Sequence, residues 1–456
     1  MRIGKCRRGR RAGGRALRSA LACVAAVVLL PVAAIAGDAG PSGWLRLRTT
    51  AYRFRTEDVD AAVLDRLGAF QEFDASAWQL AGGRLALRMA GRFADDLYLK
   101  ARTTERGRLW VGHLEARPLD RMTVRFGRQF LQEGASGLTL DGLWLSARLR
   151  PRWELRLWGG ARAPLSREFR AGGMGASGAW GLRILTAASR RLRLSGSWAY
   201  RERDGRVAAR LAGLEATISA PHGLRLVLRG TYDFEREVAQ RAEALAQWQL
   251  AARLPVVTLQ AVSRHPAIDA GSYFVRFESE PMQLLRATVR HLCERRGLGA
   301  ELEYFGSFAE ERDGHRLGAA WLFPFGRVGY SARLGDIGEE SRFYWDLCYQ
   351  AAPWIRVEGG ATFVTYALLE DAPETDERDL TTAYGRLRVT PRPGVGVILE
   401  VQSLTNPDFE EDLRLLGGID LTAGIGEARF GLAREGSLFG PRQGGKLFAS
   451  APGGGL

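Results

Sequence analysis

The sequence predicts an all-β protein, a transmembrane antiparallel β-barrel of about 22–24 strands with no large plug domain. Apolar and polar side chains alternate with a period of two along most of the 456 residues, which is the period of a β-strand. The connections between these segments are tight and loose in turn, as in barrels with short periplasmic turns and longer outer loops. An apolar row on every strand needs a cover, and in such a barrel lipid provides it.

The chain opens with a basic and then apolar segment. Residues 1–36 hold eight Lys and Arg and no acidic residue, and an apolar run leads to the small residues Ala34 and Ala36. This pattern is typical of a signal peptide, and we expect cleavage after Ala36 and delivery to the outer membrane of a Gram-negative cell. The alternative is an uncleaved anchor, but the apolar run is shorter than the ~20 residues of a helical span.

Charge and cysteine content limit the partners. Without residues 1–36 the 65 Lys and Arg fall to 57 against 51 acidic residues, so the net charge is +6 rather than +14. The remaining arginines alternate along strands instead of forming one patch, so we expect no nucleic-acid partner. Cys293 and Cys348 are the two cysteines left, too few for a disulfide framework. No haem or zinc motif is present, and we expect no cofactor and no metal.

We expect residues 37–433 to form the barrel and 434–456 to be a Gly-rich tail or a short closing strand. Residues 238–249 have a helix-forming composition but alternate like a strand, and 61–70 fit a short loop helix. The expected strands, in order, are 44–54, 68–80, 84–93, 109–117, 122–127, 143–150, 153–158, 177–188, 192–202, 206–218, 224–234, 243–253, 256–264, 272–279, 284–293, 299–307, 315–323, 327–334, 341–350, 354–366, 379–389, 395–403, 413–420 and 425–433.

A short motif lies within residues 121–162. The segment Arg125-Phe-Gly-Arg-Gln129 ends one strand, and Asp141-Gly142 opens the next. Arg128, Gln129, Asp141 and Gly142 are candidates for ordering a loop that folds inward and narrows a pore. The alternative is a local hydrogen-bond network at the strand ends, or a simple turn-exit signal at Asp141-Gly142.

With this motif, residues 83–162 resemble porin-like outer-membrane barrels, of which the alginate-export group is one example. The resemblance implies passive transport of a small or polymeric polar solute. Elsewhere in the chain the likeness is limited to the alternation of a barrel.

Charged residues gather on the polar rows. In a water-filled barrel these rows face the lumen, where guanidinium groups bind carboxylate or phosphate and opposed charges select solutes. The alternative is that they only solvate the polar face and pair across strands. The candidate pore-lining residues are Arg88, Arg92, Arg125, Arg148, Arg156, Arg193, Arg225, Arg229, Glu115, Glu154, Asp233, Arg356 and Glu358.

Three functions were compared. A porin-like channel for polar, including anionic, solutes fits best, with outer-membrane lipid, lipopolysaccharide and the solute as partners. The second is a sheath or scaffold around a partner, such as a periplasmic multihaem cytochrome or a polysaccharide-export complex. The third is an enzyme, which we do not expect, because no nucleophile–histidine constellation or metal-ligand spacing stands out.

Overall fold

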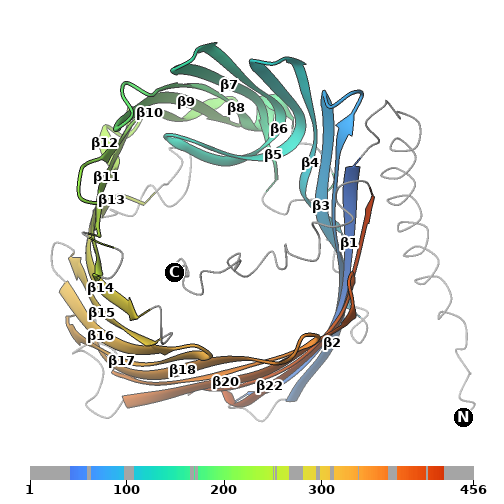
Figure 1. Ribbon diagram of the computed structural model, residues 1–456, viewed down its shortest axis with the longest axis vertical. Coiled ribbons are helices and arrows are strands. Elements are labelled where there is room, and N and C mark those ends of the chain that lie inside the picture. The colour runs from blue at the N-terminus through green and yellow to red at the C-terminus, as the bar shows by residue number, and fades with distance from the viewer. Residues whose placement is uncertain are drawn as a thin grey trace, which may run out of the picture.

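The computed structural model describes residues 42–58, 63–96, 107–164, 169, 173–249, 251, 254–266, 281–293, 298–308, 313–336, 338–367, 377–406 and 409–425. These residues form one antiparallel sheet of 22 strands. The sheet closes into a barrel because β1 (Ser42–Asp58) pairs with β2 (Val63–Leu80) on one side and with β22 (Phe409–Ile425) on the other (Figure 1). The predicted fold class is confirmed.

Every strand pairs with its neighbours in the chain. The others are β3 (Leu85–Asp96), β4 (Gly107–Leu119), β5 (Met122–Glu133), β6 (Ser136–Arg150), β7 (Trp153–Arg162), β8 (Gly178–Thr186), β9 (Leu192–Arg203), β10 (Arg206–Ser219), β11 (Leu224–Asp233), β12 (Val238–Trp248), β13 (Val256–Arg264), β14 (Met282–Cys293), β15 (Leu298–Phe308), β16 (Asp313–Phe323), β17 (Gly326–Gly335), β18 (Glu339–Ala352), β19 (Ile355–Ala367), β20 (Glu377–Arg392) and β21 (Val395–Asn406). A one-turn helix, α2 (Met174–Ser177), precedes β8.

The two faces of the wall differ in chemistry. On β10, Leu214 points outward and is 75 % exposed, while its neighbour Glu215 points inward and pairs with arginines. Large apolar side chains stay exposed on the outward rows of strands all round the barrel, Phe126 at 67 % among them. Because alternate residues of a strand face opposite sides, one polar inner wall and one apolar outer wall follow directly from the sequence pattern. Among the described residues no helix is long and apolar enough to span a bilayer.

Several local predictions were wrong. Residues 63–70 belong to β2 and are not helical, and 128–141 continue β5 and β6 as one hairpin where a gap was expected. The expected strand 413–420 is part of a longer β22 that ends at Ile425. Residues 238–248 form a strand, as expected. The predicted signal segment, strand 272–279, residues 426–433 and the tail 434–456 lie outside the described residues.

Candidate functional site: an arginine-lined lumen with an inner hairpin

The hairpin of β5 and β6 leaves the wall and enters the barrel. Beyond the paired glycines Gly127 and Gly142, the hairpin lies across the inner face of β7–β10. Figure 1 shows it inside the barrel. We call residues 128–141 the inner hairpin. At its tip the backbone N–H of Ala135 donates a hydrogen bond of 2.9 Å to Oγ of Ser197 on β9. The inner hairpin therefore occupies part of the lumen.

Glycine makes the bend of the hairpin possible. Gly127 has φ of +121°, and a Cβ there would lie 2.2 Å from the carbonyl oxygen of Gly112. Gly142 pairs with Gly127, and its Cβ would lie 2.2 Å from the carbonyl oxygen of Gly159. Real Cβ atoms do not approach a carbonyl oxygen so closely. The hairpin can therefore lie this close to β4 and β7 only because both positions are glycine.

An ion pair fixes the base of the inner hairpin. Nε and Nη2 of Arg128 donate to the two carboxylate oxygens of Asp141 at 2.6 and 2.7 Å, and Nη1 donates to the carbonyl of Leu109 on β4 at 3.1 Å. The two side chains are 3 % and 12 % exposed. Gln129, the next motif residue, is also buried. The four predicted motif residues thus meet at the base of the inner hairpin, where a fork-to-fork pair gives strict geometry.

Apolar packing holds the inner hairpin against the wall. Leu140 is fully buried, and Leu131 and Leu138 lie beside it. The part of the inner wall that the hairpin covers is apolar. The cluster consists of Leu131, Leu138, Leu140, Trp144, Trp158, Ala179, Ala199, Ala209 and Leu211. A dry core between hairpin and wall indicates a fixed narrowing of the lumen rather than a loose flap.

A buried carboxylate anchors the hairpin near its tip. The side chain of Glu133 is 7 % exposed and accepts a hydrogen bond of 3.1 Å from Nε1 of Trp144. Arg156 on β7 donates to it at 3.2 Å, and Arg183 on β8 lies at 3.5 Å. These contacts supply the partners that a buried charge needs.

Predicted lining residues near the hairpin occur in ion pairs. Nε of Arg125 donates to Glu115 at 2.8 Å, and its guanidinium lies 4.6 Å from the ring centre of Trp144. On the other side of the hairpin, Arg229 lies 3.7 Å from Glu215 and 3.6 Å from Glu243. Positive and negative charges are therefore balanced where the lumen is narrowed.

The opposite wall carries a second network. Arg356 on β19 pairs with Glu358 at 2.7 Å. Arg386 on β20 bridges Glu358 at 3.0 Å and Glu400 on β21 at 2.6 Å. The chain order of β19, β20 and β21 places these groups in one ladder across three adjacent strands.

Three further predicted residues have local roles. Arg88 lies opposite Ser76 on β2, on the inward row that also carries Asp74. Arg92 lies over the ring of Phe70, 5.2 Å from its centre. Asp233 is 1 % exposed, and its carboxylate accepts the backbone N–H of Glu235 at the end of β11. Asp233 is therefore not a water-exposed lining residue, because its carboxylate is buried and stabilises the turn that follows β11.

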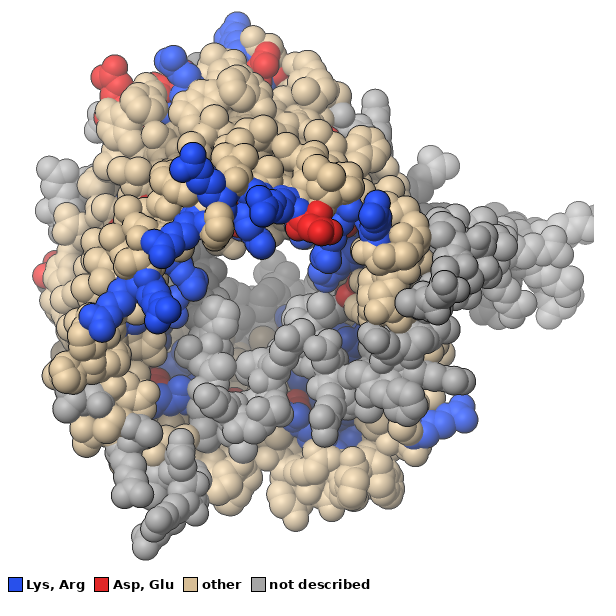
Figure 2. Space-filling model, turned by 45° about the horizontal axis from the view of Figure 1, so that its top comes forward, with Lys and Arg blue, Asp and Glu red and all other residues tan. Residues whose placement is uncertain are grey.

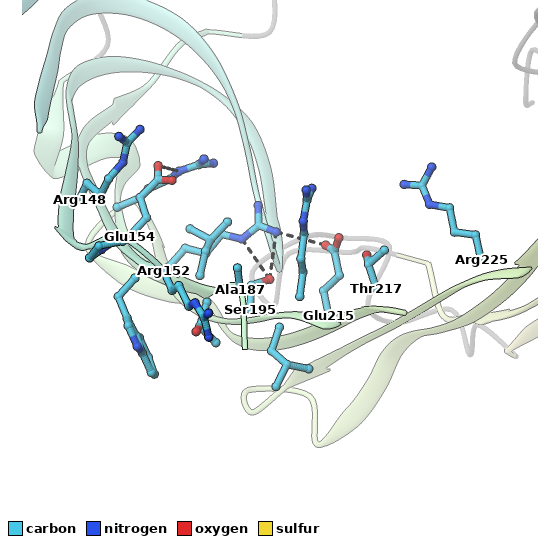
Figure 3. A pocket seen from close by; sticks show the side chains of 16 residues that line it. Arg148, Arg152, Glu154, Ala187, Ser195, Glu215, Thr217 and Arg225 are labelled. Carbon is cyan, nitrogen blue, oxygen red and sulfur yellow. Dashed lines mark hydrogen bonds and ion pairs between the residues drawn. The ribbon is translucent and has the colours of Figure 1, made fainter. Parts of the chain in front are cut away.

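The remaining predicted residues meet at one cleft. Arg148, Glu154, Arg156, Arg193 and Arg225 line a hollow of about 470 Å³ in the inner wall, beside the tight turns that join β6 to β7 and β8 to β9. Figure 3 shows several of these side chains pointing into the barrel from adjacent strands. Basic side chains also follow the rim of the opening in Figure 2.

Sequence reasoning missed four charged residues of this lumen. Glu133, Arg183, Glu215 and Arg386 link the networks described above. Period-two counting from the outward Trp180 or Leu214 places Arg183 and Glu215 on inward rows, so a signal for both was present. Glu133 could not be found this way, because its strand no longer belongs to the wall. Among the residues that the structure describes, no cluster of three potential metal ligands occurs.

Comparison with known proteins gives limited likeness. No protein-family model matches the chain, and no curated protein matches it. Solved structures similar to it include OccAB1 of Acinetobacter baumannii, at 9 % identity over 84 % of this chain and 97 % of that one, with a TM-score of 0.40. OccK3 (OpdO) of Pseudomonas aeruginosa has 9 % identity over 87 % and 99 %, with a TM-score of 0.42. A BenF-like porin from Pseudomonas fluorescens Pf-5 has 10 % identity over 84 % and 99 %, with a TM-score of 0.40. The fold stands on the strand pairing of this chain itself.

Proposed function

We propose that the protein is an outer-membrane, porin-like channel through which polar solutes, anions included, diffuse passively. The observation that carries this proposal is the opposition of the two faces of the wall. Outward rows expose large apolar side chains such as Leu214, and inward rows carry paired charges such as Arg386 and Glu400. So much exposed apolar surface is unfavourable in water and favourable in hydrocarbon, while the charged rows require water.

The arrangement of outward aromatic rings supports a membrane location. Trp153 and Trp248 lie outward beside tight turns, and each is 46 % exposed. Tyr232 and Phe234 lie at the other end of the barrel, at 40 % and 49 % exposure. Aromatic side chains near both ends fit the two interfaces of a bilayer, with lipid and lipopolysaccharide as neighbours. The tight turns would then face the periplasm.

Passive transport is favoured over a sheath. The inner hairpin fills part of the lumen and is held by a buried core around Leu140. A partner threaded through the barrel would have to fit beside it. The resemblance of residues 83–162 to porin-like barrels, the alginate-export group among them, supports transport as well. No arrangement among the described residues favours an enzyme.

Conductance in planar lipid bilayers tests the proposal. The purified, folded protein should insert and give discrete current steps in potassium chloride. Folded protein that inserts into the bilayer and yields no current would overturn the channel function. The ratio of anion to cation permeability, from the zero-current potential in a salt gradient, tests the inclusion of anions separately.

A further inference from the structure

The cleft beside the tight turns has a large excess of positive charge. Its lining contains six arginines and two glutamates, a net charge of +4, contributed by strands from β6 to β11 and the turns between them. The arginines are Arg148, Arg152, Arg156, Arg183, Arg193 and Arg225, and the glutamates are Glu154 and Glu215. Two of these arginines, Arg156 and Arg183, also contact Glu133 of the inner hairpin, so the excess of positive charge lies mainly on the other four.

Both glutamates of the cleft already have partners. Glu154 accepts hydrogen bonds of 2.7 Å from Arg156 and from Ser146. Glu215 accepts a bond of 3.2 Å from Arg183. Dashed lines in Figure 3 mark the contacts of Glu154 and Glu215 with these two arginines.

Three other arginines of the cleft have no such partner. Arg148, Arg193 and Arg225 make no ion pair with any residue that the structure describes. In Figure 3, Arg148 and Arg225 extend into the lumen from opposite sides of the cleft. Arg148 lies opposite Glu154 in the strand pairing, so Arg193 and Arg225 are the guanidinium groups most available to an anion that enters from water.

The spacing of these arginines indicates the size of the ligand. Thr217 of β10 lies directly opposite Arg193 of β9, and the neighbouring inward residue Ser219 lies opposite Arg225 of β11. Adjacent strands are about 4.8 Å apart and two residues extend about 6.7 Å along a strand, so the backbones of the two arginines lie about 12 Å apart. A solute with two or more anionic groups can contact both guanidinium groups at once, whereas a monoanion engages one.

We propose that this cleft is a binding site for small solutes with two or more carboxylate or phosphate groups, so that their passage through the barrel saturates. The inference rests on the proposed channel function and adds a stationary site to it. The site adjoins the narrowing at the inner hairpin, because Arg156 and Arg183 line the cleft and also contact Glu133. Arg193 and Arg225 lie on the side of the cleft away from these contacts and have no carboxylate of the protein as an ion-pair partner among the described residues. Selection by charge number would then occur in the cleft, and selection by size at the hairpin.

Isothermal titration calorimetry of the full chain in detergent tests the site, with citrate, pyrophosphate and acetate as probes. Citrate and pyrophosphate should bind saturably at one site, and acetate at least about tenfold more weakly, because it engages fewer guanidinium groups. Saturation by citrate alone would restrict the site to carboxylates, and saturation by pyrophosphate alone would restrict it to phosphates. Absence of saturable binding by both would overturn the proposal.

Two matched double variants locate the site. R193Q/R225Q should weaken citrate binding by at least about tenfold. R342Q/R388Q removes the same charge from inward rows of β18 and β20, across the barrel, and should change the affinity less than about twofold. Equal weakening by both would mean a diffuse field and would contradict the site. If R193Q/R225Q does not fold, the single variant Arg225→Gln and the salt dependence of wild-type binding decide instead.

Current recordings on the same preparations separate the two proposals. Conductance in potassium chloride without saturable citrate binding contradicts the cleft and leaves the channel intact. Citrate binding by a protein that inserts but does not conduct contradicts the channel.

Discussion

The guanidinium of Arg128 and the carboxylate of Asp141 face each other across β5 and β6 and form two hydrogen bonds of 2.6 and 2.7 Å. The pair lies where the hairpin leaves the wall, and the Arg128 side chain is 3 % exposed. A buried pair of this geometry determines where the bend occurs, because neither charge can be left alone in a dry environment.

Asp141→Asn should therefore destabilise the barrel. The substitution leaves the buried Arg128 without its counter-charge, and breaking one partner of such a pair costs about 3–5 kcal/mol. Guanidinium chloride unfolding from lipid vesicles measures the free energy. The matched control is Asp204→Asn in the exposed turn between β9 and β10, where the loss should be under about 1 kcal/mol. Equal losses would contradict the role given to the pair.

Gly142→Ala should disturb the bend itself. The new Cβ would lie 2.2 Å from the backbone oxygen of Gly159, so the strands would have to move apart. We expect a loss of more than about 2 kcal/mol and a changed single-channel conductance. Gly137→Ala, near the tip of the same hairpin, has open space around its Cβ and should change stability by no more than about 1 kcal/mol. If Gly142→Ala changes neither the stability nor the conductance, the close approach of Gly142 to Gly159 is contradicted.

Glu133→Gln should raise the preference of the channel for anions. Glutamine can still accept a hydrogen bond from Trp144, but the negative charge that neutralises Arg156 and Arg183 is lost. The ratio of anion to cation permeability should rise by at least about twofold. The control, Glu237→Gln in the turn after β11, should leave this ratio unchanged. A fall in the ratio for Glu133→Gln would speak against a charge-balanced narrowing.

Leu214→Arg tests the outward row. The position lies in the middle of β10 and is 75 % exposed, so the new charge would sit in hydrocarbon at a cost of about 2–4 kcal/mol. Gln260→Arg adds the same side chain to an inward position of β13, beside Glu243, and should cost less than about 1 kcal/mol. Folding yield into vesicles and the free energy of unfolding measure both. A larger loss of stability for Gln260→Arg than for Leu214→Arg would contradict an outer face that contacts hydrocarbon.

The wall could be predicted from sequence because one local rule, the period of two, governs every strand. The rows of β11, with Leu226 and Leu228 outward and Arg225 and Arg229 inward, are one example. The expected range of strand number narrows to 22 in the structure. Of the two additional predicted segments, 272–279 lies outside the described residues, and the last begins at Ile425, where β22 ends.

The details of the inner hairpin could not be predicted from the period of two, because its apolar side chains pack inside the barrel. Its leucines, Leu131 and Leu138, pack against the inner wall rather than against lipid, and Arg128 is buried although its neighbours along the motif are polar. The motif residues marked the place, because paired glycines and an Arg–Asp pair are unusual in a plain strand. Their partners on β4 and β7–β10 come from distant parts of the sequence, so pattern alone could not supply them.

Cysteine accessibility along β11 is the most direct test of the two-faced wall. In a background with Cys293 and Cys348 replaced by serine, single cysteines at Arg225, Arg229 and Thr231 should react with a charged, membrane-impermeant thiol reagent and change the channel current. Cysteines at Leu226 and Leu228 should not react and should leave the current unchanged. Uniform reactivity at both sets, or reaction at the leucine positions alone, would contradict a barrel with water inside and hydrocarbon outside.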